Sequence, residues 1–180
     1  MDGVVISVAR NSEHHFSKQP VSTIQIIAGL GVEGDAHQGV TVKHRSRVRV
    51  DPTQANLRQV HLIHAELFDE LAIKGFTVAP ADLGENITTR GIDLLALPQG
   101  TILKIGRDVA LKITGLRNPC AQIDAFRKGL LAAVLDRAEN GDVIRKSGIM
   151  AIAIAGGVVC AEDVIEVVLP PEPYLPLEPV

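Results

Sequence analysis

The sequence is poor in aromatic residues and in cysteine, and both shortages limit what the protein can do. It has no tryptophan, and aromatic side chains make up 3% of its 180 residues. The core must therefore be aliphatic, and the chain lacks the aromatic platforms on which proteins stack single-stranded nucleic acid. The two cysteines stand 40 positions apart and do not make a disulfide framework.

Charge and hydropathy exclude further classes of protein. The formal net charge of −3 gives no overall attraction to nucleic acid or to acidic membranes. No apolar run reaches the roughly 20 residues of a membrane-spanning helix. The first residues lack the basic and long apolar regions of a signal peptide. We therefore expect a cytoplasmic protein with reduced thiols and with neither nucleic acid nor membrane as a partner.

Common metal-binding and phosphate-binding motifs are missing as well. No His-Glu-x-x-His or Cys-x-x-Cys pattern occurs, which argues against a zinc site made of protein side chains alone. No Gly-x-x-x-x-Gly-Lys loop occurs either. Residues 29–34 fit the spacing of a dinucleotide-binding fingerprint, but no helical pattern follows them and the chain lacks alternating βαβ units.

What the sequence does have is many short apolar runs of strand type. Val109, Leu111 and Ile113 alternate with Ala110 and less apolar residues, which is the period of a strand with one buried face. We expect strands over residues 4–8, 24–27, 60–63, 101–105, 109–114, 150–155 and 163–169. Residues 106–108 and 156–157 are expected to form hairpin turns.

Two segments have the period of a helix. Residues 64–74 and 129–140 each carry apolar side chains on one helical face, and each ends before a glycine. Many short strands with two helices predict a mostly β fold, a β-barrel with a few peripheral helices. We expect one domain over residues 1–170 and an extended proline-rich tail over 171–180.

The longest segment without clear periodicity runs from residue 29 to about residue 59. A loop of that length inside a compact domain is usually functional or disordered. Five cations gather near its end, on a chain that is acidic overall: Lys43, Arg45, Arg47, Arg49 and Arg58. They predict a local anion site, and the alternative is a solvated, mobile loop.

Cys120 is the leading candidate for chemistry. It directly follows Arg117, Asn118 and Pro119 at the end of a predicted strand. A fixed positive charge beside a thiol favours the thiolate, which is both the nucleophile and the metal ligand, and proline stiffens the loop. The alternative is a small buried hydrophobe, which is our interpretation of Cys160.

Two further clusters carry polar groups. Glu85, Asn86 and Thr88 follow Gly84, which lets the backbone approach another group closely; the alternative is a turn capped by its own side chains. If residues 58–64 form a strand, His61 lies on one face and His64 on the other.

Taken together and in order, these motifs resemble the MOSC domain, which is found at the C-terminus of molybdenum cofactor sulfurases. The thiol motif is the most specific of them, and the resemblance spans about residues 1–170. The chain is most similar to short, stand-alone bacterial members of the family. The matching segments are GVEGDAH (31–37), RQVHLI (58–63), GENI (84–87), GLRNPC (115–120) and GIM (148–150).

The resemblance implies a mostly β, barrel-like fold and the molybdenum cofactor, molybdopterin. It places the family cysteine at Cys120, which would carry sulfur or ligate molybdenum, with Arg117 and Asn118 beside it. Relatives reduce N-hydroxylated compounds, so the implied substrate is an N-hydroxylated small molecule. Nine residues are then expected to bind or orient the cofactor: Asp35, His37, Lys43, Arg45, Arg47, Arg58, Glu85, Asn86 and Thr88.

The sequence departs from larger relatives in ways that leave three functions open. It has no room for their extra N-terminal β-rich domain and no pyridoxal-phosphate desulfurase domain. An N-hydroxyl reductase would need an external electron donor, since no haem or flavin motif is visible. A sulfur carrier would need a donor protein to load a persulfide on Cys120. The third possibility is a non-catalytic module that binds the cofactor or another anion.

Overall fold

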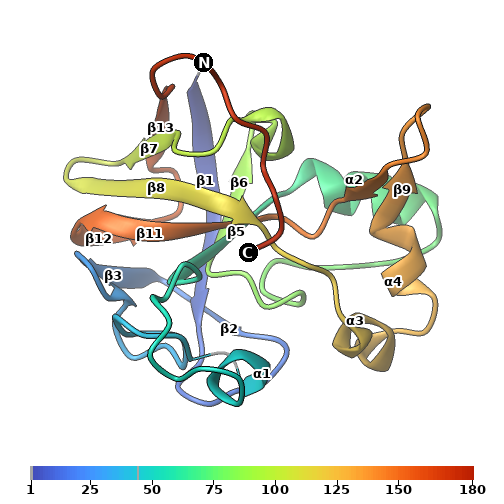
Figure 1. Cartoon of the computed structure of the whole chain (residues 1–180), viewed down its shortest axis with the longest axis horizontal. Coiled ribbons are helices and arrows are strands. Elements are labelled where there is room, and N and C mark those ends of the chain that lie inside the picture. Colours follow the sequence, from blue (N-terminus) through green and yellow to red (C-terminus); the bar gives the residue numbers. More distant parts are fainter. Residues whose placement is uncertain (1, 44) are drawn as a thin grey trace.

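The centre of the protein is a closed β-barrel (Figure 1). The computed structural model describes residues 2–43 and 45–180. Seven strands hydrogen-bond in a ring, in the order β13-β7-β8-β11-β5-β6-β1, and β1 pairs back onto β13. Every neighbouring pair is antiparallel except β5 and β6. The predicted mostly β barrel is confirmed.

The elements of the described residues are short. The barrel strands are β1 (Asp2–Arg10), β5 (Val60–His64), β6 (Ile87–Arg90), β7 (Ile102–Ile105), β8 (Val109–Leu116), β11 (Ile149–Ala155) and β13 (Val164–Val168). The other strands are β2 (Gln19–Val21), β3 (Thr23–Ile27), β4 (Gly31–Val32), β9 (Leu135–Arg137), β10 (Val143–Arg145) and β12 (Gly157–Cys160). The helices are α1 (Arg45–Val48), α2 (Glu66–Ile73), α3 (Ala121–Phe126), α4 (Leu130–Ala133) and the 3-10 helix η1 (Leu94–Ala96). In the described part of the chain, no helix has the length and apolar character to cross a membrane.

Aliphatic side chains from alternate strand positions fill the barrel. Val109, Leu111 and Ile113 of β8 all point into it and are buried, as their period predicted. Burying one such side chain is worth about 1.5–3 kcal/mol relative to leaving it exposed. A core of this kind needs no aromatic residue, and the barrel core contains none.

Strand β5 separates the barrel core from a second core. Leu62 faces the barrel interior, while Ile63 joins an apolar cluster with residues of α2, α3 and α4. His61 shares the face of Ile63, because side chains alternate along a strand. The strand therefore places a histidine on the outside of the barrel, next to the second core.

The strands expected from the sequence are all present, and so is the turn at 106–108, which joins β7 to β8. The expected helix at 64–74 is α2. It begins later than expected, because His64 pairs with Thr89 as the last residue of β5.

The helix expected over residues 129–140 is wrong beyond its first turn. Only α4 is helical, and the chain then forms the hairpin β9–β10. The apolar face ends at Leu135, so later residues had no buried side to favour a helix. The pair Asn140-Gly141 is a strong hairpin-turn signal, and Gly141 adopts a φ of 88°.

The hairpin turn expected at 156–157 is also wrong. The chain leaves the barrel here, and β12 pairs with β3 in a separate three-stranded sheet with β4. Gly156 serves close packing against β3 and not a tight turn, because a Cβ there would lie 2.7 Å from the carbonyl oxygen of Ile26. The two glycines allow the backbone at residues 156–157 to approach the backbone of β3 closely.

The long segment 29–59 is a folded arm rather than a structureless loop. Its base is closed by a bridge between Thr41 and Ala55 and by the backbone bond from Asn56 N to Val40 O. The Asn56 amide donates to the carbonyls of His37 and Gly39. These bonds join the two ends of the segment that contains α1, so this helix lies at the far end of the arm.

The proline-rich tail packs against β8. Leu116 N donates to Glu178 O at 2.8 Å, and Val180 N donates to Leu116 O at 3.2 Å. The chain end therefore lies at the point where β8 passes into the Cys120 loop (Figure 1).

Candidate functional site

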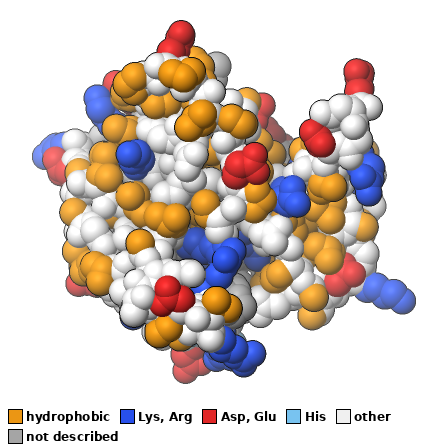
Figure 2. All heavy atoms as spheres, viewed as in Figure 1, with side chains coloured by type: hydrophobic (Ala, Val, Ile, Leu, Met, Phe, Trp, Pro, Cys, Tyr) orange, Lys and Arg blue, Asp and Glu red, His pale blue; other side chains and the backbone are white. Residues whose placement is uncertain are grey.

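A cavity of about 310 Å³ opens on the flank of the barrel, between the arm that carries α1 and the start of α3. Figure 2 shows it as a hollow whose walls are lined by Lys and Arg side chains. Its lining residues come from segments far apart in the sequence: His14, His15, Phe16, Lys18, His37, Arg45, Arg47, Arg58, His61, Leu83, Gly84, Asn86, Arg117, Asn118, Cys120, Gln122 and Met150.

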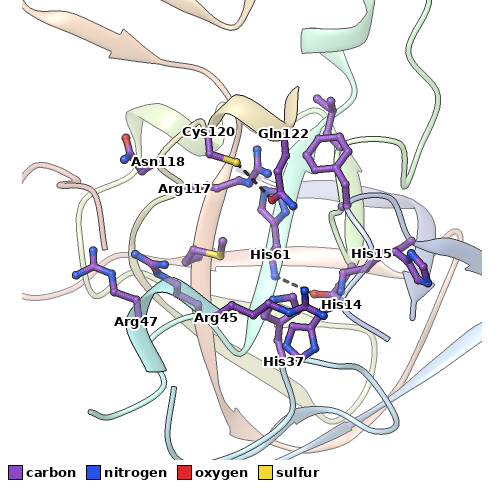
Figure 3. A pocket seen from close by; sticks show the side chains of 17 residues that line it. His14, His15, His37, Arg45, Arg47, His61, Arg117, Asn118, Cys120 and Gln122 are labelled. Atoms are coloured by element: carbon purple, nitrogen blue, oxygen red, sulfur yellow. Dashed lines mark hydrogen bonds between the residues drawn. The ribbon is translucent and has the colours of Figure 1, made fainter. Parts of the chain in front are cut away.

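Cys120 stands at the wall of this cavity, directly before α3. The residue is partly exposed, and its Sγ donates a hydrogen bond to Gln122 Oε1 at 3.6 Å (Figure 3). The loop before it is held in two places. Arg117 N donates to Gly148 O, and Asn118 Oδ1 accepts from Arg145 Nε at 3.2 Å. The thiol is therefore presented to the cavity on a braced loop.

Arg117 is a buried cation with an unused donor. Its guanidinium lies over the ring of Phe16, 5.7 Å from the centroid, and near Cys120 in Figure 3. Its Nη1 is sealed from solvent and has no hydrogen-bond partner among the described residues. Burial lowers the pKa of Arg117, and the neighbouring Cys120 and Glu85 oppose this effect. A buried guanidinium N–H group without an acceptor is costly, so the cavity favours a ligand that offers Nη1 an acceptor, and an anion would do so best.

The opposite wall adds more positive charge. Arg58 lines the cavity with Arg45 and Arg47 of α1. Burial lowers the pKa of Arg58, and repulsion from Arg47 and Arg117 lowers it further. An anion that binds between these arginines would reduce the electrostatic repulsion among them.

An ion-paired network supports the lower part of the cavity. Asp35 is buried and accepts hydrogen bonds from Lys18 Nζ at 2.6 Å, from Asn86 Nδ2 at 3.1 Å and from the backbone of Asn11. Burial alone would raise the pKa of Asp35, but the hydrogen bond from His37 and the charge of Lys18 outweigh it, so the pKa lies well below its usual range. Asp35 thus anchors Lys18, His37 and Asn86, all three of which line the cavity.

His61 forms part of the cavity floor and is neutral. Burial lowers its pKa to about 3, and the charge of Arg117 acts in the same direction. In the neutral ring, Nε2–H donates to Ser147 O at 2.8 Å. His61 is therefore held in place and adds no charge to the site.

The structure brings together eight of the twelve residues expected at the site. The eight that line the cavity are His37, Arg45, Arg47, Arg58, Asn86, Arg117, Asn118 and Cys120. The other four lie outside the lining: Asp35 and Lys43, and the fully buried Glu85 and Thr88 behind it.

The lining also contains residues that the sequence analysis did not select. His14, His15 and Phe16 come from the connection between β1 and β2, and Met150 comes from β11. Two adjacent histidines in a polar connection were the signal that could have indicated the first group. Nothing in the sequence separates Met150 from an ordinary core residue.

The donor set around the cavity is cationic and contains one thiol. Within residues 2–43 and 45–180, no three His, Cys, Asp or Glu side chains gather so that they could hold a metal ion. Cys120 offers a single soft sulfur ligand, and cationic side chains surround it. This combination suits an anionic ligand better than a bare cation.

Comparison with known proteins agrees with this picture at the level of family and fold. The model of the MOSC domain matches residues 13–166. The solved structure of the YuaD protein from Bacillus subtilis is 23% identical, with a TM-score of 0.77 over 93% of this chain and 96% of that chain. YiiM from Escherichia coli is 22% identical, with a TM-score of 0.65 over 97% of this chain and 73% of that chain. These two likenesses show a shared fold. Comparison with curated proteins gives no match.

Proposed function

The chain belongs to the MOSC domain family, which is associated with the molybdenum cofactor, and we propose that its cavity binds this cofactor and reduces N-hydroxylated compounds. The thiolate of Cys120 would ligate the metal. The observation that carries the proposal is the unpartnered Nη1 of Arg117 near Cys120, in a cavity with arginines on its other wall.

The residues present fit an anionic cofactor. Arginine forks bind phosphate oxygens with two parallel hydrogen bonds, so Arg45, Arg47 and Arg58 would hold the cofactor phosphate. Arg117 would offset negative charge around the sulfur of Cys120. The volume of about 310 Å³ is at the lower end of small-molecule sites, which span about 300–1,000 Å³, and the hollow opens to solvent in Figure 2.

When bound, the cofactor would supply the two electrons that break the N–O bond of the substrate. The reduction also consumes two protons and releases an amine and water, and an external donor protein would replace the electrons. The chain itself would bind and orient the reactants. Phe16, Leu83 and Met150 contribute apolar surface to the lining of the cavity, which the organic part of a substrate would contact.

Metal and pterin analysis tests the proposal. Protein made in a host that synthesises the cofactor should contain molybdenum and pterin, and after addition of an electron donor it should reduce an N-hydroxylated substrate. Protein from a host that lacks the cofactor is the control. Protein with neither molybdenum nor pterin, and without reduction after reconstitution, would contradict the proposal. Tight binding without turnover would instead support a non-catalytic binding module.

A second candidate function is a sulfur carrier, and the accessibility of Cys120 favours it. The residue is partly exposed and lines the cavity, and its one side-chain hydrogen bond among the described residues is the weak S–H donation to Gln122. The Cys120 thiolate would attack the outer sulfur of a donor persulfide, form a new S–S bond and release the donor thiolate. Mass spectrometry after sulfur loading would detect one added sulfur atom, about 32 Da, on Cys120. A plain thiol under those conditions counts against this function.

A further inference from the structure

The carboxylate of Asp35 binds two cavity residues, one through each of its oxygens. Oδ1 accepts a hydrogen bond from Lys18 Nζ at 2.6 Å. Oδ2 accepts from the backbone N of His37 at 3.1 Å and from its ring Nδ1 at 3.3 Å. The side chain of Asp35 is 0% exposed, whereas that of His37 is 27% exposed and lines the cavity. The imidazole of His37 therefore stands between a buried carboxylate and the cavity.

This carboxylate decides which ring nitrogen of His37 carries a hydrogen. Burial alone would raise the pKa of Asp35, but the hydrogen bond from His37 and the charge of Lys18 hold it well below its usual range, so Asp35 is ionised. An ionised carboxylate only accepts hydrogen bonds, so Nδ1 of His37 carries a hydrogen. The proton that the ring can gain or lose is then the one on Nε2. A carboxylate in this position also stabilises the imidazolium, as it does in catalytic Asp–His pairs.

Among the lining residues that the structure describes, His37 is the one histidine held by a buried carboxylate. Burial lowers the pKa of His61 to about 3, so its ring stays neutral. His14 donates from Nε2 to a backbone carbonyl at 3.1 Å. His15 contacts Glu13, whose side chain is 75% exposed. The arginines of the lining do not release protons in proteins.

His37 lies across the cavity from Cys120 (Figure 3). The cavity between them is small, about 310 Å³, so a ligand inside it lies near both walls. A substrate whose nitrogen faces the thiol side would direct its hydroxyl oxygen to the wall that carries His37. A proton donor must come within hydrogen-bond reach of the atom it protonates, and this placement meets that requirement.

We propose that His37 is the proton donor of the reduction and that Asp35 is its positioning residue. The imidazolium gives its Nε2 proton to the hydroxyl oxygen while the N–O bond breaks, and the oxygen leaves as water. Two electrons come from the reduced cofactor, and the amine nitrogen takes the second proton from solvent. His37 then regains its proton from solvent at Nε2. This inference rests on the proposed reductase function and adds the source of one of its two protons.

NMR of the histidine ring nitrogens tests the geometry on cofactor-free protein, without any turnover. The neutral ring of His37 should carry its hydrogen on Nδ1. His14 is the internal reference, because its Nε2 faces a carbonyl oxygen and must carry the hydrogen there. A wild-type His37 with its hydrogen on Nε2 would overturn the proposal.

Asp35→Asn should reverse this tautomer. Three donors meet Oδ1, from Lys18, Asn86 and the backbone of Asn11, so the amide oxygen of the new side chain should stay on that side. The amide NH₂ group then faces Nδ1 of His37 and donates to it, which leaves the ring hydrogen on Nε2. A variant that keeps the hydrogen on Nδ1 would show that Asp35 does not orient the ring.

Activity of the cofactor-loaded protein tests the proton transfer itself. His37→Asn keeps a side-chain N–H for Oδ2 of Asp35 but has no proton to release near neutral pH. Its rate of N-hydroxyl reduction should fall about 100-fold or more, while its content of molybdenum and pterin and its circular dichroism stay those of the wild type. With the O-acetylated form of the same substrate the loss should nearly vanish, because acetate leaves without a proton.

The results separate this inference from the proposed function. If the wild type and His37→Asn reduce the N-hydroxylated substrate equally fast, the role of His37 is overturned and the reductase stands. An equal loss with both substrates would also overturn it, since a merely structural effect does not depend on the leaving group. A loaded wild type that reduces neither substrate would contradict both proposals.

Discussion

At the residue scale, the site contains two buried charged residues that differ in how well their hydrogen-bonding groups are satisfied. Arg117 has an unused donor, whereas Asp35 is surrounded by donors and paired with Lys18 at 2.6 Å. A buried charge that loses its partner is strongly destabilising. Ligand binding and folding therefore depend on different charges of the same cavity, and mutations can separate the two.

Lys18→Met should destabilise the protein by about 3 kcal/mol, because it leaves Asp35 as a buried carboxylate without its cation. The remaining hydrogen bonds from Asn86 and the backbone of Asn11 keep the loss from being larger. Urea unfolding at pH 7 measures the change. The double variant Lys18→Met with Asp35→Asn should recover part of the loss; no recovery would show that the packing of Lys18, and not its charge, was responsible.

Acid should remove the stability that ionised Asp35 contributes. The folded-state pKa of Asp35 lies far below its usual value, so its contribution is fully present above the unfolded-state pKa of about 4 and is lost as pH falls below that value. We expect the free energy of unfolding to fall between pH 5 and the lowest accessible pH. In Asp35→Asn this fall should be clearly smaller, and an equal fall in both proteins would contradict the assignment.

Replacing the thiol tests the proposed metal ligand. In Cys120→Ser a hard hydroxyl replaces a soft sulfur donor, and we expect metal affinity to fall at least as much as the roughly tenfold seen when an outer-shell partner is removed, so that less molybdenum is bound per protein. Cys160→Ser is the matched control. Cys160 lies in β12, away from the cavity lining, so its replacement should leave molybdenum content unchanged. Equal metal content in the two variants would rule out a thiolate ligand at Cys120.

Sequence alone identified the candidate site residues that are neighbours in the chain. Cys120, Arg117 and Asn118 are adjacent in the chain, and the structure places all three at the cavity. Glu85 was expected to contact a ligand but lies behind the lining. Whether a side chain lines a cavity or lies buried behind it depends on segments that are distant in the sequence. A local sequence pattern carries no information about those segments.

At the element scale, period 2 predicted β8 because one face of this strand lies in a single aliphatic core. The barrel strand β6 was not predicted, since Ile87 is the only apolar residue of Ile87–Arg90 and no alternation marks it. The same reasoning failed at residues 134–137, where Val134 continues the helical pattern but Leu135 opens strand β9. The outcome there depends on the cross-strand partner β10, about ten residues further on. Apolar spacing carries no information about such a partner.

The barrel also explains why Gly148 precedes β11. A Cβ at Gly148 would overlap the carbonyl oxygen of Leu62 and meet Ile63 Cγ1 at 2.7 Å. Gly148→Ala should therefore destabilise the protein by about 2 kcal/mol or more, through overpacking added to backbone strain. Gly141→Ala is a close control, since its φ of 88° resembles the 91° of Gly148 but a Cβ there meets no atom within 4 Å. Thermal unfolding of both variants tests this, and equal destabilisation would show that φ alone matters.

At the scale of the whole molecule, the tail is bound to the barrel by contacts that cross the expected boundary at residue 170. Besides its backbone bonds to Leu116, Gln99 N donates to Leu175 O, and Leu177 packs on the barrel core. Deleting residues 175–180 should cost about 2–4 kcal/mol, from three hydrogen bonds of about 1 kcal/mol each and one partly buried leucine. Urea unfolding measures this loss. Leu177→Ala separates the apolar part, and a truncated protein as stable as the full chain would make the tail dispensable.

Ring closure has a consequence for the order in which the protein folds. The first strand, β1, completes the barrel by pairing with the last, β13, through partners such as Gly3 and Ile165. During synthesis, one edge of β1 must wait for more than 150 residues to be added before its partner exists. Contacts of such long sequence separation slow folding, and an unpaired strand edge is prone to aggregation. Until β13 has been synthesised and has paired with β1, that edge of the barrel is open to pairing with another chain.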